Sequence, residues 1–340
     1  MQPDSVAVCV PVRDEDEALP TLLTALRGQQ AAAGVELTFC FYLDGCRDGS
    51  EALLRAAAAD FPHALHVVAG PRHAVANAGR ARRAAFAIAR ERIAAADAVF
   101  LTTDADSRPA SDWIVAGCRA LHRADVAAGT LRRAEPHALQ SRVEAYYDRL
   151  HRYRRAVDPV AWDPGDGRHF GGGANLAIRA STYDALGGFA ERPSGEDAAL
   201  LDEASRAGFR VRRDPAMVVE TSSRRHGRAP AGLAAALADL DRNGLPEVAH
   251  PAAAAWQYRA QARARAAFAA IHDEAIRRQL GDFLGLSADH LLGVARECPN
   301  AEAFAMRVVP SPPGGERLVP LVEAEAALAH LERRMSEATA

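Results

Sequence analysis

The fold is decided by the stretch Ala98-Val-Phe-Leu-Thr-Thr-Asp104-Ala105-Asp106, in which a short apolar run ends in two carboxylates. A run of this kind is typical of a strand buried in a parallel sheet. Residues i and i+2 of an extended segment project to the same side, so we expect Asp104 and Asp106 to converge where the strand ends. Ligands bind at that end of the strands in open α/β sheets. The pair predicts either a site for a hard cation such as Mg²⁺ or Mn²⁺, which prefers oxygen ligands, or a solvated turn.

The chain before this stretch alternates between strand and helix patterns. The apolar runs that predict strands are 6–10, 37–43, 66–69 and 98–103. The patterns with helical periodicity are 16–27, 50–60 and 79–96. Strands and helices that alternate at this spacing argue for βαβ units and a mainly parallel central sheet flanked by helices.

The chain after this stretch changes texture twice. A helical pattern at 137–157 is followed by a loop rich in Gly, Asp and Pro at 158–173, and then by a mixed block at 174–220 with a helix at 197–207. Beyond about residue 229 the patterns are Ala-rich and helical, near 230–243, 252–282, 287–297 and 318–337. We therefore expect two domains, an α/β domain at 1–228 and an α-helical extension at 229–340.

Composition excludes several classes of protein. The 340 residues include 41 basic side chains, all of them Arg, against 44 acidic ones, and the resulting net charge of −3 argues against a broad electrostatic grip on nucleic acid. The five cysteines are scattered and form no Cys-x-x-Cys, which favours reduced thiols in a cytoplasm. We find neither a signal peptide nor an apolar stretch that approaches 18 residues, so we expect a cytoplasmic protein without a membrane span. Peripheral membrane association stays open.

Two further acidic positions each allow two interpretations. Asp44 ends the predicted strand 37–43, where a carboxylate accepts hydrogen bonds from a nucleobase or a ribose, or simply forms a turn with Gly45. The run Gly195-Glu196-Asp197 precedes a helix, where a carboxylate acts either as a cap or as a general base beside a nucleophilic hydroxyl.

Read together and in order, these motifs resemble an inverting family 2 glycosyltransferase with the GT-A fold. The resemblance covers about residues 5–228 and leaves out the helical tail. The segments that carry it are Val10-Pro11-Val12-Arg13-Asp14-Glu15, Leu43-Asp44-Gly45-Cys46-Arg47-Asp48-Gly49-Ser50, Ala81-Arg82-Arg83, Leu101 to Asp106, Asp112-Trp113-Ile114, Gly173-Ala-Asn175, Leu186-Gly187-Gly188-Phe189 and Glu196-Asp197.

This resemblance implies a GT-A catalytic domain that transfers a sugar from a nucleotide-diphosphate donor to an acceptor hydroxyl, assisted by Mg²⁺ or Mn²⁺. Asp197 would be the catalytic base, with Glu196 supporting the acceptor site. The metal ligands would be Asp104, Asp106 and His226. The nucleotide-sugar site would consist of Pro11, Val12, Glu15, Asp44, Arg82, Asp104, Ala105, Asp106, Gly172, Gly173, Arg224 and Arg228. The basic segment 222–228 would close over the metal and phosphates, or be a solvated loop.

Some residues depart from the family pattern and other functions remain as alternatives. Arg13-Asp14 stands where an aromatic-Asn pair is usual, and Leu43 and Arg83 also differ, which affects the identity of the nucleotide. The processive-synthase motif Gln-x-x-Arg-Trp is absent after Asp197, which favours single addition. A sugar nucleotidyltransferase would need a Gly-rich basic loop after the first strand, and residues 11–15 contain no glycine. A non-catalytic nucleotide-sugar-binding partner protein is the other alternative. We expect the tail to pack on the catalytic domain or to form a homodimer.

Overall fold

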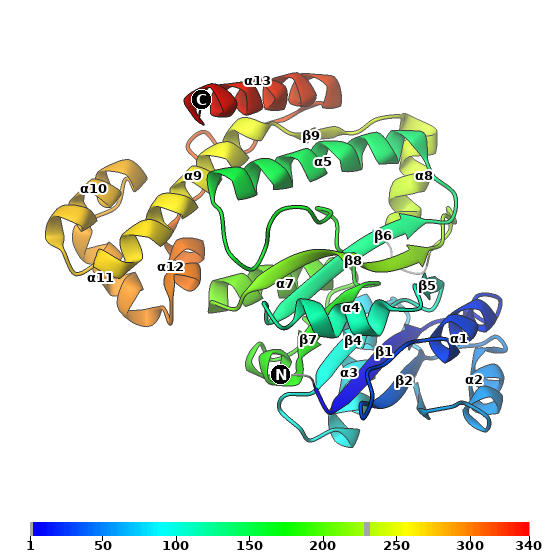
Figure 1. Cartoon of the computed structure of the whole chain (residues 1–340). Coiled ribbons are helices and arrows are strands. Elements are labelled where there is room, and N and C mark those ends of the chain that lie inside the picture. The colour runs from blue at the N-terminus through cyan, green and yellow to red at the C-terminus, as the bar shows by residue number, and fades with distance from the viewer. Residues whose placement is uncertain (1–2, 228–231, 340) are drawn as a thin grey trace.

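A computed structural model describes residues 3–227 and 232–339 (Figure 1). Its centre is an eight-stranded sheet with the order β3-β2-β1-β4-β7-β6-β8-β5. The strands are β1 (Ser5–Val12), β2 (Glu36–Asp44), β3 (Ala64–Gly70), β4 (Val99–Thr102), β5 (Ser107–Pro109), β6 (Val126–Arg133), β7 (Leu176–Arg179) and β8 (Val211–Thr221). The neighbours from β3 to β4, and the pair β6 and β8, are parallel, whereas β7 and β5 run antiparallel to their neighbours. The expected mainly parallel central sheet is confirmed.

Helices cover both faces of this sheet. Those of the first 210 residues are α1 (Leu19–Arg27), α2 (Ser50–Ala58), α3 (Ala78–Arg92), α4 (Trp113–Ala120), α5 (Ala138–Val157), α6 (Ala180–Ala185) and α7 (Glu196–Ala207). Because the strands from β1 to β4 are parallel, their carboxyl ends lie at one edge of the sheet, as the strand–helix alternation predicted.

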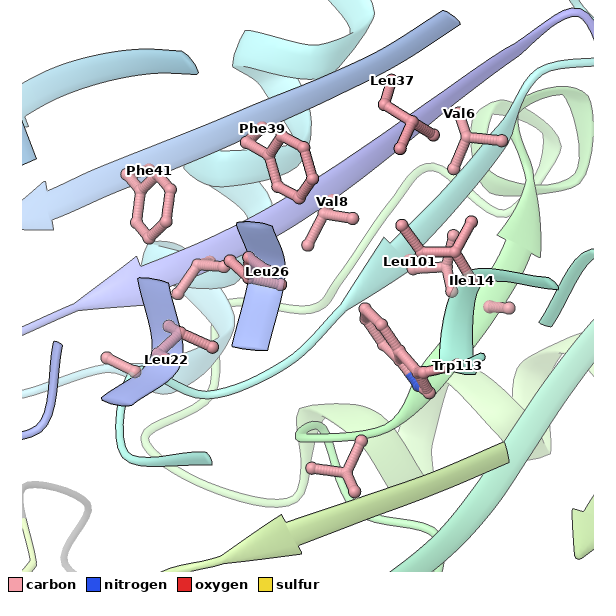
Figure 2. Close-up of a cluster of buried hydrophobic side chains, with 14 of the residues drawn as sticks. Val6, Val8, Leu22, Leu26, Leu37, Phe39, Phe41, Leu101, Trp113 and Ile114 are labelled. Carbon is pink, nitrogen blue, oxygen red and sulfur yellow. The ribbon is translucent and has the colours of Figure 1, made fainter. Parts of the chain in front are cut away.

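Strand β1 shows why its sequence is apolar at every position. Val6 and Val8 face one core, and Ala7 and Cys9 face the core on the other side. Figure 2 shows the first core, in which side chains of β1, β2 and β4 point toward α1 and α4. Trp113 begins α4, is fully buried and donates its indole N–H to Asn175 Oδ1 at 2.8 Å, which ties α4 to the segment before β7. Burial on both faces is what makes such strands continuously apolar.

The C-terminal part is helical, as expected. Its elements are α8 (Leu233–Asn243), β9 (Glu247–Ala249), α9 (Pro251–Ala267), the 3₁₀ turn η1 (Phe268–Ala270), α10 (Glu274–Leu284), α11 (Ala288–Glu297), α12 (Ala301–Val308), β10 (Leu318–Pro320) and α13 (Leu321–Thr339). The helical pattern expected over 252–282 is interrupted at η1, because the side chain of Asp273 caps a new helix by accepting the backbone N–H of Ala275. None of the helices in residues 3–227 and 232–339 combines bilayer-spanning length with sufficient hydropathy.

The C-terminal helices pack on the α/β part of the same chain. Helix α5 shares a core with α9 and α13, and Figure 1 shows it lying between the sheet and α13. Tyr146 of α5 donates its hydroxyl to the carbonyl of Ala249 at 2.7 Å. Helix α12 packs against α7, which carries the Glu196-Asp197 pair. A boundary at 228/229 falls on residues outside the described ranges and stays a prediction.

Candidate active site

A single cavity of about 1240 Å³ opens at the carboxyl ends of β1, β2 and β4 and extends toward α5, α7 and α12. Most of the site residues expected from the sequence line it. These are Pro11, Val12, Glu15, Asp44, Arg82, Asp104, Ala105, Asp106, Gly172, Gly173, Glu196, Asp197 and Arg224. The fold therefore brings together acids from three distant stretches of the chain, although their roles remain predictions.

The two carboxylates that follow β4 differ in their surroundings. The Asp104 side chain is 38% exposed, whereas Asp106 is 16% exposed and lies 3.1 Å from Arg224. Burial and the neighbouring Asp104 carboxylate raise the pKa of Asp106 to about 6, and Arg224 opposes part of that rise. Both side chains offer only oxygen atoms as ligands, and both are negatively charged when ionised. Such a pair suits a hard divalent cation.

Arg224 joins the start of the chain to the segment after β8. Its guanidinium donates to both Glu15 carboxylate oxygens at 2.5 and 2.6 Å, a bidentate geometry, and also approaches Asp106. The hydrogen bonds to Glu15 raise the pKa of Arg224. The cation expected to clamp a phosphate therefore sits directly beside the acidic pair and closes that side of the cavity.

Arg82 of α3 connects the acidic groups on the two sides of the cavity. It donates to Asp104 Oδ1 at 2.9 Å and to Glu196 Oε1 at 3.1 Å, and also to the hydroxyl of Thr102 and the carbonyl of Gly173, both at 2.8 Å. Burial acts to lower the pKa of this guanidinium, but the Asp104 and Glu196 carboxylates outweigh it and raise the pKa above its ordinary value. Arg82 therefore bridges Asp104, which follows β4, and Glu196, which begins α7, and its expected place near a diphosphate stays a prediction.

Only glycine fits at position 173, because of this arginine. A Cβ on Gly173 would lie 2.4 Å from Arg82 Nη2. The backbone N–H of Gly173 in turn donates to Asp197 Oδ2 at 2.6 Å. Gly173 therefore contacts both Arg82 and Asp197, the predicted base.

The Glu196-Asp197 pair stands at the start of α7 but does not cap it in the usual way. The N-cap residue is Gly195, which has a φ of 73° and no side-chain cap hydrogen bond. Glu196 is 4% exposed, and burial raises its pKa although Arg82 opposes the shift. Asp197 is half-buried, lines the cavity and accepts the N–H groups of Gly173 and Ala198. This geometry favours the interpretation as a positioned carboxylate over that as a simple cap.

Asp44 has two partners that the sequence patterns did not suggest. It is 2% exposed and accepts from Arg13 Nη1 at 2.6 Å, while Arg80 Nη2 lies 3.9 Å from its other oxygen. That second oxygen, Oδ1, is buried and has no hydrogen-bond partner among the described residues. Arg13 could have been noticed in the sequence because it departs from the family pattern. Nothing in the sequence singled out Arg80.

The expected third metal ligand lies apart from this arrangement. His226 is exposed and is not among the residues that line the cavity, and Arg228 lies outside the described residues. Within the described ranges, Asp14, Cys46 and Asp48 form the group whose ligand atoms lie within 4.8 Å of one another. Its carboxylates already accept from Arg72 and from backbone N–H groups, which indicates a hydrogen-bonded turn.

Comparison with known families assigns the N-terminal half. The model of the family described as "Glycosyl transferase family 2" matches residues 7–163. Residues 7–163 belong to glycosyl transferase family 2. This match is shorter than the resemblance expected over about 5–228, so the positions of Glu196, Asp197 and Arg224 rest on the geometry described above. No curated protein matches the chain.

Solved structures similar to the chain include two in complex with nucleotide sugars. TarS 1-349 from S. aureus, in complex with UDP-GlcNAc, is 14% identical with a TM-score of 0.49, covering 90% of each chain. The mannosyltransferase PcManGT from Pyrobaculum calidifontis, in complex with GDP-Man and Mn²⁺, is 18% identical with a TM-score of 0.48, covering 99% of this chain and 81% of the other. Both scores lie below 0.5, so the family assignment rests on the match over residues 7–163.

Proposed function

We propose that the chain transfers one sugar at a time from a nucleotide-diphosphate donor to an acceptor hydroxyl, with inversion at the anomeric carbon and with the help of a divalent cation. The observation that carries this proposal is that Asp197 and the pair Asp104 and Asp106 line one cavity on opposite sides of the Arg82 bridge. Displacement at an anomeric carbon needs a base on one face and a stabilised leaving group on the other, and these acids supply one group for each.

The donor side is the carboxyl edge of β1, β2 and β4. Pro11, Val12 and Glu15 would line the nucleotide pocket, and the unpartnered Oδ1 of Asp44 would accept an N–H from the base. The oxygens of Asp104 and Asp106 would hold Mg²⁺ or Mn²⁺. When bound, this cation neutralises charge that develops on the departing diphosphate. Arg224, which already lies between Glu15 and Asp106, would bind a phosphate oxygen.

The acceptor side is formed by Asp197 and the glycine run at 171–173. Asp197 would accept the proton of the acceptor hydroxyl as the new bond between that oxygen and the anomeric carbon forms. The bond from the anomeric carbon to the phosphate oxygen breaks in the same displacement, and the nucleoside diphosphate leaves. The Gly173 N–H orients the carboxylate, and Glu196, held by Arg82, fixes the start of α7. A positioned base typically contributes about 10²–10⁴-fold in rate.

The remaining parts of the proposal rest on sequence and composition. Single addition is favoured because the Gln-x-x-Arg-Trp motif is absent after Asp197. The catalytic domain would span residues 1–228, and a helical extension would follow it. All five cysteines are unpaired thiols, which is compatible with the cytoplasm as the compartment.

The experiment is a donor screen with matched variants. UDP-, GDP- and dTDP-sugars, including UDP-GlcNAc and GDP-Man, are incubated with the chain and Mn²⁺, and release of the nucleoside diphosphate is measured. We expect slow hydrolysis of one donor class, abolished in Asp106→Ala and unchanged in Asp60→Asn, an exposed aspartate paired with Arg27 far from the cavity. Nucleotide binding without turnover that is indifferent to Asp197→Asn would favour a non-catalytic binding protein. Formation of a nucleotide sugar from a sugar phosphate would favour a nucleotidyltransferase.

A further inference from the structure

The part of the cavity beneath α5 is lined by charged groups that the proposed reaction does not use. We call it the inner chamber. It is defined by His151 and Arg155 of α5, Asp163 of the loop after α5, Arg213 of β8, and Glu302 and Met306 of α12. Its walls thus come from both the α/β part and the C-terminal helices, and in Figure 1 the loop after α5 runs between α5 and β8.

Arg213 has no close counter-ion among the described residues of this chamber, although the charges of Asp163 and Asp148 act on it from a longer distance. No carboxylate of the described chain lies within ion-pair distance of its guanidinium, and its buried Nη1 has no hydrogen-bond partner there. Burial lowers the pKa of Arg213 to about 10, so it stays protonated at neutral pH. An uncompensated charge in such a place destabilises the fold, and this cost is recovered when a ligand supplies the opposite charge.

Neighbouring groups point to the same deficit of negative charge. Arg154 also has no carboxylate partner among the described residues; its guanidinium donates to Gln261 at 3.3 Å and lies over the Tyr258 ring. His151 is 3% exposed, and its Nε2 lies 3.6 Å from Asp163, too far for a hydrogen bond. Arg155 shares the same Asp163, also at 3.6 Å. Several N–H donors are therefore buried and unsatisfied at one place.

The surrounding ion pairs limit the charge that the chamber can accept. Asp148 pairs with Arg168. Asp158 and Glu302 both pair with Arg265, so these three side chains together carry one net negative charge. Against the two unpaired arginines, this excess leaves a net charge of about one positive unit. The balance therefore fits a singly charged anion better than a dianionic phosphate monoester.

The inner chamber connects to the base side of the reaction site. A Cβ on Gly171 would lie 3.4 Å from Arg213 Nη1, and a Cβ on the next residue, Gly172, would lie 3.6 Å from Asp197 Oδ2. The unpaired guanidinium and the predicted base thus flank adjacent glycines. Phe170, just before them, is 41% exposed and lines the cavity, offering an apolar face to a sugar ring.

We infer that the acceptor is a monoanion whose phosphodiester or carboxylate group binds Arg213 in the inner chamber while one of its hydroxyls reaches Asp197. This inference rests on the proposed function, because it assigns the acceptor class of the same site. A charge-assisted, bidentate contact from a buried guanidinium gives such a group both affinity and orientation.

The test compares charged probes with neutral probes of related structure. One pair is bis-glycerol phosphodiester and glycerol, and the other is methyl glucuronide and methyl glucoside. Their dissociation constants for the full-length chain are measured by calorimetry. We expect the charged member of one pair to bind at least about tenfold more tightly, and the pair that shows this preference identifies the source of the charge. Equal binding of charged and neutral members in both pairs would overturn the inference.

Variants show whether Arg213 is responsible. Arg213→Gln should reduce the preference for the charged member about 10–100-fold, Arg213→Lys should restore part of it, and Arg108→Gln, an exposed arginine on β5, should leave it unchanged. A preference that survives Arg213→Gln would contradict the assignment. If Arg213→Gln does not fold, Met306→Glu and its uncharged match Met306→Gln decide the matter. The added carboxylate should abolish the preference and the amide should keep it, and the reverse result or no difference would refute the inference.

Donor hydrolysis measured on the same preparations separates the two proposals. If donor hydrolysis is present and the charge preference is absent, the inner chamber is not an anion site but the transferase proposal stands. If the charge preference is present without donor hydrolysis, the anion site is real and the proposed function fails.

Discussion

Replacing Arg82 by Met is the change for which the structure makes the sharpest prediction. The substitution removes four hydrogen bonds and leaves Glu196 buried without its cation. Removing one partner of a buried ion pair costs about 3–5 kcal/mol. We expect the free energy of unfolding to fall by about that amount at pH 7.5, measured by urea unfolding. Arg83→Met is the matched control, because Arg83 makes one hydrogen bond, to the carbonyl of Phe189, and should cost about 1 kcal/mol or less.

The same loss should depend on pH in a defined direction. Burial already raises the pKa of Glu196 in the folded protein, and removing Arg82 raises it further. A carboxyl whose folded pKa lies above its unfolded value destabilises the fold when it ionises, so the penalty should grow as pH rises above the unfolded pKa, near 4.5. Arg82→Met should therefore be less destabilising at pH 5 than at pH 7.5. A loss below about 1 kcal/mol, or one that is the same at both pH values, would refute the role given to this arginine.

Three further outcomes follow from the site. Asp197→Asn should lower the transfer rate about 10²–10⁴-fold, whereas the nucleotide affinity, measured by calorimetry, should stay within about twofold. The control Asp60→Asn should change neither the rate nor the affinity. Affinity for Mn²⁺ should fall about tenfold per pH unit below about 6, because the pKa of Asp106 is raised to about 6 and its protonated form is a poor ligand; a flat profile from pH 7 to 5 would contradict this. Gly173→Ala should lower the melting temperature and the rate together, because the new methyl would lie 2.4 Å from Arg82 Nη2; wild-type values for both would show that the loop can move away.

The first half of the fold could be predicted because three of its strands, β1, β2 and β4, are buried on both faces. That burial makes β1, β2 and β4 continuously apolar, and the intervening helices keep a regular stripe. Strand β6 escaped prediction because its sequence Val-Ala-Ala-Gly-Thr-Leu-Arg-Arg consists largely of residues that do not favour strands, and tertiary contacts with β7 and β8 hold it. The interruption at η1 was missed because an Ala-rich run hides the cap at Asp273.

The acids of the site were predictable and most of their partners were not. Asp44, Asp104 and Asp197 follow strands or begin a helix, which are positions that a sequence pattern reveals. Whether an arginine finds a partner depends on contacts between segments far apart in the chain. Arg13 pairs with Asp44, whereas Nη1 of Arg213 has no hydrogen-bond partner among the described residues. No local pattern distinguishes one arginine among so many.

The most direct measurement of the central claim is the configuration of the first product. Proton NMR of donor hydrolysis in Mn²⁺ records which anomer of the free sugar forms before mutarotation, with water in the place of the acceptor. We expect the anomer opposite to that of the donor, and loss of the signal in Asp197→Asn. First formation of the same anomer as in the donor, or full activity of Asp197→Asn, would contradict the assignment of Asp197 as the base opposite the leaving group.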